Sequence, residues 1–154
     1  MPSGNQAPIG SHATHTGSCL CGGVRFSIHG PLAPIQICHC SQCRKAQGGP
    51  LAANIPVPVN QIEWISGQEL LREFESSPGK LRAFCASCGS PVYSRRASLA
   101  GVLRIRAGLL DEPLDAGLAF HQHVRSRASW WPLCDDGLPR HGAAADPGQK
   151  RDNR

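Results

Sequence analysis

The chain has 154 residues, enough to bury the core of one domain without the covalent staples that much smaller domains need. Its formal net charge is +5 and 18% of its residues are charged, so the sequence permits an anionic partner but does not require one. No stretch approaches the roughly 18 consecutive apolar residues of a membrane-spanning helix, so we expect no membrane segment.

Short strands are predicted along most of the chain. Apolar residues alternate with polar ones, or form brief extended runs, at residues 24–28, 35–38, 62–66, 81–84, 91–94 and 101–106. The 17 glycines and 13 prolines supply turns between these segments. The pattern indicates a mainly β fold with minor helical turns.

Three further segments have a less regular pattern. Residues 41–47 predict a helical turn that ends at Gly48. Residues 51–59 contain two prolines and are expected to form at most an edge strand, because proline cannot donate a hydrogen bond within a sheet. Residues 69–76 fit both an amphipathic helix and a strand.

The two ends of the chain differ in composition from the rest. Residues 1–16 and 141–154 lack hydrophobic periodicity, so we expect them to be disordered on either side of one domain at residues 17–140. The N-terminal segment has neither the basic region nor the apolar core of a secretory signal. We therefore expect a cytoplasmic protein.

Cysteine is the most informative residue type, because eight thiols in a reducing cytosol indicate metal ligands or catalytic groups rather than disulfides. Seven of them form three clusters and one stands alone: Cys19 and Cys21; Cys38, Cys40 and Cys43; Cys85 and Cys88; and the single Cys134. Close spacing lets neighbouring sulfur atoms converge on one ion, which suits zinc. A redox-active dithiol is the alternative, but no βαβ pattern surrounds these pairs.

Seven clustered thiols divide into one site of four ligands and one of three. Four thiolates form a closed structural zinc site, whereas three leave a position for water, substrate or an added thiol. The short segment from Cys38 to Cys43 favours a locally formed three-ligand site, because little loop closure is needed. The counts also allow another partition, in which the pairs ending at Cys43 and Cys88 form an ordinary zinc ribbon.

Three cysteine-containing runs and a C-terminal pattern together carry a family resemblance. The runs are GSCLCGGVRF at residues 17–26, CHCSQCRKAQG at 38–48 and FCASCGSP at 84–91, and the C-terminal pattern is GLLD at 108–111, His121, SRASW at 126–130 and DDGLP at 135–139. This set resembles the glutathione-dependent formaldehyde-activating enzyme family, also called the centromere protein V/Gfa domain. The resemblance covers about residues 17–140.

The resemblance implies a β-tent (Mss-like) fold of short antiparallel sheets around a structural zinc, with two Zn²⁺ per chain. The ligands that match the structural zinc site are Cys19, Cys21, Cys85 and Cys88. Cys38, Cys40 and Cys43 match the second, catalytic site. This is the partition that locality favours.

The resemblance also implies a zinc-dependent carbon–sulfur lyase or synthase, in which a glutathione-like thiol adds to a small electrophile. For formaldehyde the product is S-hydroxymethylglutathione. His39 is a candidate to carry the proton, and Arg44 and Lys45 are candidates to bind a carboxylate of glutathione. The alternative is that His39 fills space and faces solvent, while Arg44 and Lys45 form a solvated helix face.

Two other classes of function compete with the enzyme. A non-enzymatic zinc scaffold or interaction module needs only the four-ligand site, so three further convergent thiols favour an enzyme. Nucleic-acid binding is disfavoured, because the arginines are scattered along the sequence and indicate no continuous basic stripe.

Overall fold

The computed structural model describes residues 13–145; residues 1–12 and 146–154 lie outside the described part. The strands are β1 (Thr14–Ser18), β2 (Arg25–His29), β3 (Ile35–Cys38), β4 (Ala52–Pro58), β5 (Ile62–Ser66), β6 (Leu71–Ser77), β7 (Lys80–Cys85), β8 (Pro91–Arg96), β9 (Val102–Arg106) and β10 (Leu118–Gln122). One α-helix, α1 (Ser41–Gln47), follows β3, and short 3-10 turns connect several strands. The prediction of a mainly β fold is confirmed.

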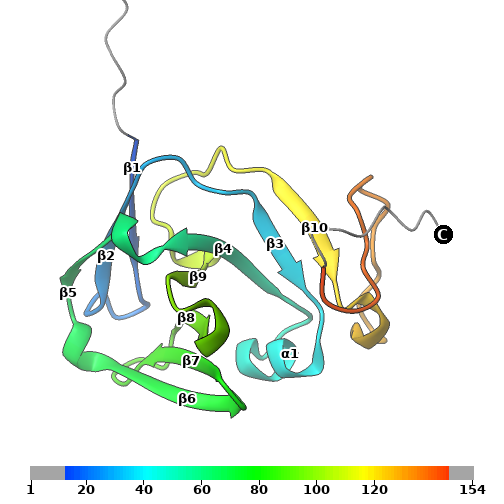
Figure 1. The fold of residues 1–154 in the computed structure, drawn as a ribbon, viewed down its shortest axis with the longest axis horizontal. Helices are drawn as coiled ribbons and strands as arrows, with labels where there is room; N and C mark the ends of the chain where they lie inside the picture. The colour runs from blue at the N-terminus through cyan, green and yellow to red at the C-terminus, as the bar shows by residue number, and fades with distance from the viewer. Residues whose placement is uncertain (1–12, 146–154) are drawn as a thin grey trace, which may run out of the picture.

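The strands form two sheets. β1, β2 and β5 make a three-stranded antiparallel sheet, and the other seven strands pair in the order β10-β3-β4-β9-β8-β7-β6. The larger sheet is mixed rather than wholly antiparallel, because β10 pairs parallel to β3. Figure 1 shows this sheet strongly curved, with α1 in the opening between its two arms.

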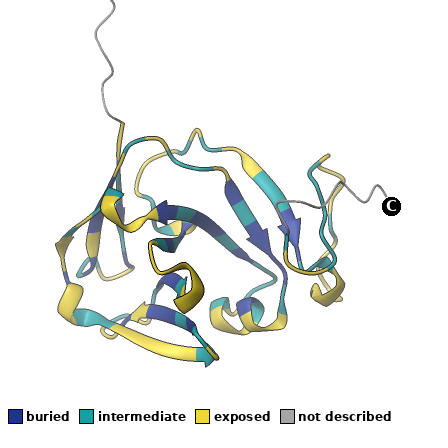
Figure 2. Cartoon of the chain, viewed as in Figure 1, coloured by how far each residue is buried: buried dark blue, intermediate teal, exposed yellow. Residues whose placement is uncertain are grey.

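The core joins the two sheets through aromatic and branched aliphatic side chains. Phe26 on β2 packs edge-on against Trp64 on β5 at 5.7 Å between ring centroids, and Trp64 in turn meets Tyr93 on β8 at 5.9 Å. Ile55 and Ile105, on the paired strands β4 and β9, are fully buried. Burying a side chain of this size contributes about 1.5–3 kcal/mol. Figure 2 shows the buried residues concentrated along β2, β3 and β4.

The expectation that residues 51–59 form at most an edge strand is wrong, since β4 lies between β3 and β9. The prolines are tolerated because β3 pairs only with Ala52, Ala53 and Asn54. Pro56 and Pro58 lie in the half of β4 where β9 is the only neighbouring strand. A missing N–H is compatible with an exposed strand edge of this kind.

The ordered domain extends beyond the boundaries expected from the sequence. Residues 14–16 belong to β1, which pairs with β2. At the other end, the His141 N–H donates to the His121 carbonyl at 2.8 Å, and the His123 N–H donates to the Ala143 carbonyl at 2.9 Å. Polar edge segments such as these show little hydrophobic periodicity, because backbone hydrogen bonds rather than apolar faces hold them.

The helix α1 follows the sequence prediction. Cys40 caps its N-terminus by accepting a hydrogen bond from the Cys43 N–H at 3.3 Å. Gly48 ends the helix with φ of 66°, a left-handed conformation that glycine adopts without the strain a side chain would bring. The cap fixes where Cys40 and Cys43 stand relative to the end of β3.

Candidate metal centres and their cavity

Two knuckles from distant parts of the sequence form a four-cysteine cluster. Cys19 and Cys21 lie in the β1–β2 connection, whereas Cys85 and Cys88 lie at the end of β7 and in the turn after it. All four sulfur atoms are within 4.8 Å of one another. The Leu20 N–H donates to Ser90 Oγ at 2.9 Å and ties one knuckle to the other.

Hydrogen bonds around this cluster stabilise the thiolates of Cys19 and Cys88. At Cys21 the Gly23 N–H is outweighed by the side chains of Cys19 and Cys88, which raise the pKa of Cys21 to about 11. The Val24 N–H donates to Cys19 Sγ at 3.3 Å, and although burial opposes it, this bond holds the pKa of Cys19 below its ordinary value. The side chain and backbone of Ser90 lower the pKa of Cys88 to about 5. Four converging sulfurs with lowered pKa values among them match the donor set of a structural zinc site.

A three-cysteine cluster forms locally where β3 passes into α1. Cys38 ends β3, Cys40 caps α1 and Cys43 lies in its first turn. Their sulfur atoms also lie within 4.8 Å of one another. The structure therefore brings together the four-plus-three grouping, and the ribbon that would join Cys43 with Cys88 does not form.

The three-cysteine cluster favours one thiolate strongly. Hydrogen bonds from the Cys38 and Cys40 thiols, together with the nearby Arg82 guanidinium, hold the pKa of Cys43 far below its ordinary value. The same contacts with Cys40 and Cys43 raise the pKa of Cys38. Arg82 places its two terminal nitrogens 3.7 and 3.8 Å from Cys43 Sγ. The Arg82 guanidinium therefore offsets the negative charge of the Cys43 thiolate.

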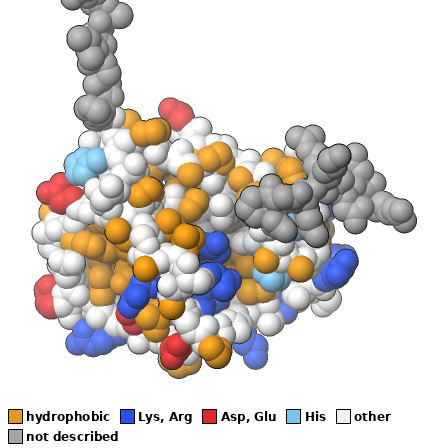
Figure 3. All heavy atoms as spheres, viewed as in Figure 1, with side chains coloured by type: hydrophobic (Ala, Val, Ile, Leu, Met, Phe, Trp, Pro, Cys, Tyr) orange, Lys and Arg blue, Asp and Glu red, His pale blue; other side chains and the backbone are white. Residues whose placement is uncertain are grey.

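The three-cysteine cluster lines a cavity of about 440 Å³ together with residues of β4 and of β7 to β10. Five cations line the same cavity: Lys80, Arg82, Arg96, Arg104 and Arg106. Its other polar side chains include Asn54, Ser94 and Gln122, and none of the lining residues within 13–145 is a carboxylate. We call it the cationic cavity; Figure 3 shows Lys and Arg side chains gathered near the centre of this face.

Sequence reasoning missed these cations by treating the arginines as scattered. They occupy alternate positions on three neighbouring strands, so that Lys80 and Arg82 on β7 and Arg104 and Arg106 on β9 share one face. The spacing of two was visible in the sequence. The sequence did not show which strands lie side by side, or that the face carrying these cations lies next to the cysteines.

His39 lies in neither place expected for it, because it is fully buried and does not line the cationic cavity. Its Nε2 is 2.8 Å from His121 Nδ1, and His121 Nε2 is 2.7 Å from an Asp136 carboxylate oxygen. Burial is the main reason that the pKa of His39 lies below its ordinary value. The chain from Asp136 through His121 to His39 connects the C-terminal segment to the turn that carries Cys38 and Cys40.

Arg44 and Lys45 also lie outside the cavity. The Arg44 Nε donates to the Ser126 carbonyl at 3.2 Å, and Lys45 is exposed. Cys134 is exposed and belongs to neither cysteine cluster.

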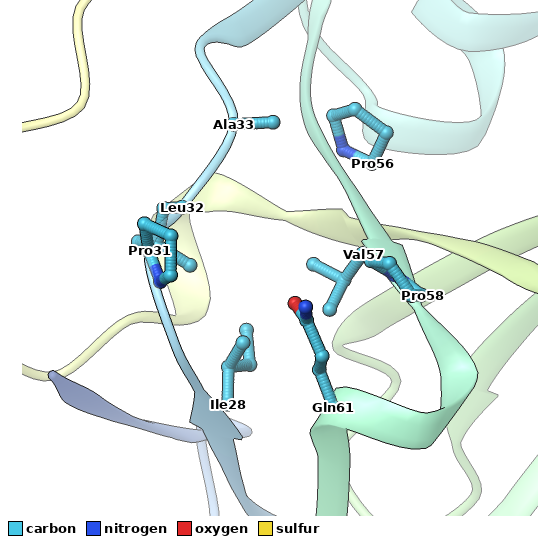
Figure 4. Close-up of a pocket in the computed structure, with 8 residues that line it drawn as sticks. All are labelled: Ile28, Pro31, Leu32, Ala33, Pro56, Val57, Pro58 and Gln61. Carbon is cyan, nitrogen blue, oxygen red and sulfur yellow. The ribbon is translucent and has the colours of Figure 1, made fainter. Parts of the chain in front are cut away.

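A second cavity, of about 290 Å³, lies between β2, the following loop and the proline-containing half of β4. Figure 4 shows it lined by apolar side chains such as Ile28, Leu32 and Val57, with the Gln61 amide as its polar group. None of its lining residues within the described part of the chain is ionisable, so these residues offer no acid, base or metal ligand. Among residues 13–145, no helix is long and apolar enough to cross a membrane.

Comparisons with known proteins found a similar sequence and a similar fold. A Halomonas elongata protein, provisionally named a glutathione-dependent formaldehyde-activating enzyme, is 38% identical over 84 residues. That match covers 50% of this chain and 53% of the relative, so the chain spans about half the length of the curated relative.

A crystal structure of a Rhodobacter sphaeroides protein superposes with a TM-score of 0.54 and 23% identity, covering 65% of this chain and 91% of that chain. This similarity supports the fold alone. The sequence profile described as glutathione-dependent formaldehyde-activating enzyme matches residues 14–131. The chain therefore belongs to the glutathione-dependent formaldehyde-activating enzyme family.

Proposed function

We propose that the chain is a zinc-dependent carbon–sulfur lyase or synthase that adds a glutathione-type thiol to a small electrophile, such as formaldehyde, at the three-cysteine cluster. One observation carries the proposal: three converging sulfurs form part of the wall of a cavity large enough for small substrates. A purely structural metal site has no need of an adjoining cavity with five cations.

The donor sets fit two zinc ions. Cys19, Cys21, Cys85 and Cys88 supply a closed set of four thiolates. Cys38, Cys40 and Cys43 supply three and leave one position for a cosubstrate. A zinc ion held by these three cysteines would supply Lewis acidity, which would favour the thiolate form of an incoming thiol at neutral pH.

The chain's own residues hold and orient the substrates. Arg82 faces the cluster and offsets its negative charge through its contact with Cys43. Arg96 and Arg104, the more exposed cations of the cavity, are the proposed partners of the carboxylates of a glutathione-like thiol, the role first expected of Arg44 and Lys45. Gln122 and Asn54 add neutral hydrogen-bonding groups to the cavity.

His39 lies outside the cavity, so it positions the turn that carries Cys38 and Cys40 rather than carrying a proton at the reacting atoms. Its ring is directed to His121 and buried, while its backbone joins two metal-ligand candidates. The His39 N–H donates to the Gln122 carbonyl at 3.0 Å, which fixes the turn against β10. We assign His39 a positioning role, in line with the way second-layer contacts orient metal ligands.

The test compares two cysteine variants of the full chain. The exchange between formaldehyde, glutathione and S-hydroxymethylglutathione is measured by NMR and corrected for the uncatalysed rate. We expect wild type and Cys134→Ser to accelerate the exchange equally, and Cys43→Ser to lose at least about 100-fold of that acceleration, as for loss of a group that acts directly in the chemistry. No acceleration by the wild-type protein, with both zinc sites filled, would leave the scaffold function as the better account.

A further inference from the structure

The cationic cavity holds more positive charge than a neutral electrophile can use. Its cations come from three strands, β7, β8 and β9, and three of them, Lys80, Arg82 and Arg106, are less than 10% exposed. Within the described residues, ion pairs form at His29, Arg95 and His121, so none of the five has a carboxylate partner. Charged groups this deeply buried are normally paired.

Neutral groups satisfy these cations only in part. Lys80 Nζ donates to Ser94 Oγ at 3.0 Å, and one terminal nitrogen of Arg106 donates to the Asn54 side-chain oxygen. Arg106 Nε is buried and has no hydrogen-bond partner in the part of the chain that the structure describes. Burial, followed by the charges of Arg104 and its neighbours, lowers the pKa of Lys80 to about 8. The kind of partner that these buried cations lack is an anion.

The negative charges of the three-cysteine site and of the proposed reactants do not balance the five cations. Three thiolates around one Zn²⁺ carry one net negative charge. Glutathione bound through its thiolate brings two net negative charges, since its ammonium group cancels one of its two carboxylates. Against five cations, two positive charges remain while formaldehyde occupies the site.

We infer that the electrophile entering this cavity carries its own carboxylate, so that the substrate class is an aldehyde acid or another 2-oxo acid. The inference rests on the proposed thiol addition and names the substrate class of the same site. In the reaction the thiol adds across the carbonyl group: the C–S bond forms, the C=O π bond breaks, and the thiol proton ends on the former carbonyl oxygen. Nothing is oxidised or reduced.

The position of the cations suits this class. Arg82 stands beside the sulfur cluster through Cys43, and Arg106 lies on the same face of the large sheet. In a 2-oxo acid the carboxylate is bonded directly to the reacting carbon, so it can contact these inner cations while that carbon faces the sulfurs. The carboxylates of glutathione lie several bonds from its thiol, which leaves the more exposed Arg96 and Arg104 for them.

The first part of the test is kinetic. Glutathione addition is followed with glyoxylate, an aldehyde acid, and with formaldehyde, and each rate is divided by its uncatalysed rate. We expect the acceleration for glyoxylate to exceed that for formaldehyde by at least about 10-fold, the effect of one charge-assisted contact. Arg106→Gln should remove that preference, and Arg25→Gln, an exposed arginine outside the cavity, should retain it. Equal or greater acceleration with formaldehyde overturns the inference but leaves the proposed function intact.

The second part measures binding without turnover. Glycolate, which has the carboxylate but no carbonyl, and uncharged ethylene glycol are titrated calorimetrically into the zinc-loaded protein, with zinc content checked before and after. We expect glycolate alone to bind, with Arg25→Gln unchanged and both Arg106→Gln and Lys80→Met weakened by about 10-fold. Failure of glycolate to bind wild type overturns the inference. If glycolate binds but the protein accelerates thiol addition to neither electrophile, the cavity still binds carboxylic acids and the proposed lyase function is wrong.

Discussion

Lys80 shows how a single residue of the cationic cavity opposes folding. It is 6% exposed and faces a hydroxyl group, Ser94 Oγ, rather than a carboxylate. Its ordinary pKa is 10.5 and its pKa in the folded chain is about 8, so the unfolded state binds the proton more tightly. Between these values the wild-type protein gains stability as pH rises, and below pH 8 it bears the full cost of the charge.

We therefore expect Lys80→Met to raise the melting temperature at pH 7. The gain should shrink as pH increases from about 8 toward 10.5, where wild-type Lys80 becomes neutral in both states. Thermal unfolding across this pH range measures the difference, and Lys45→Met, at an exposed position, serves as the control. A lower melting temperature for Lys80→Met at pH 7 would show that its charge already has a partner.

His39 is a second residue whose role depends on burial. His39→Ala removes the hydrogen-bond partner of His121 Nδ1 inside the protein, and a buried group left unpaired costs about 1–3 kcal/mol. We expect the free energy of unfolding in urea to fall by that amount or more. His29→Ala, at a half-exposed histidine, should cost less than about 1 kcal/mol. Equal losses in the two variants would contradict the positioning role.

The sequence alone could not place His39, because its partner lies 82 residues away on β10. His121 and His123 are two residues apart, the spacing of side chains on one face of a strand. Instead, β10 ends at Gln122 and His123 adopts a left-handed φ of 56°, so the two rings do not share that face. Only the parallel pairing of β10 with β3 brings His121 to the cysteine turn.

At the scale of an element, Gly48 stabilises the C-terminal end of α1. Gly48 has φ of 66° with open space around it, whereas Gly49 also has open space but no positive φ. Gly48→Ala should therefore lower the free energy of unfolding by about 1 kcal/mol through backbone strain alone. Gly49→Ala should have little effect or stabilise slightly. Urea denaturation measures both, and equal effects would contradict the assigned cap.

The strands differ in how far their sequence predicts them. The region of β9 was predicted from clean alternation, and β4 was misjudged, because the cost of a proline depends on whether a neighbouring strand needs its N–H. β1 and β10 were not predicted: β1 carries no apolar side chain, and β10 has three adjacent apolar residues rather than an alternating pattern. The cationic cavity shows the same limit: alternation places Arg104 with Arg106 on one face, but only the strand order shows what that face meets.

At the scale of the whole molecule, curvature of the large sheet brings distant segments together. The β3–α1 turn, the cations of β7 to β9 and residues 144 and 145 all line one cavity. The cysteine grouping could be expected from spacing, because local clusters converge at little entropic cost. The charge of the cavity could not, because it depends on which strands are neighbours.

We propose that the chain holds two zinc ions at sites of different kinds, one closed and one open to the cavity. Metal analysis of purified wild-type protein and of the Cys38→Ser/Cys40→Ser/Cys43→Ser variant tests this claim most directly, with circular dichroism to confirm that both are folded. We expect two zinc ions per chain in wild type and one in the folded variant. One zinc ion in the wild-type protein, or two in the variant, would contradict the account.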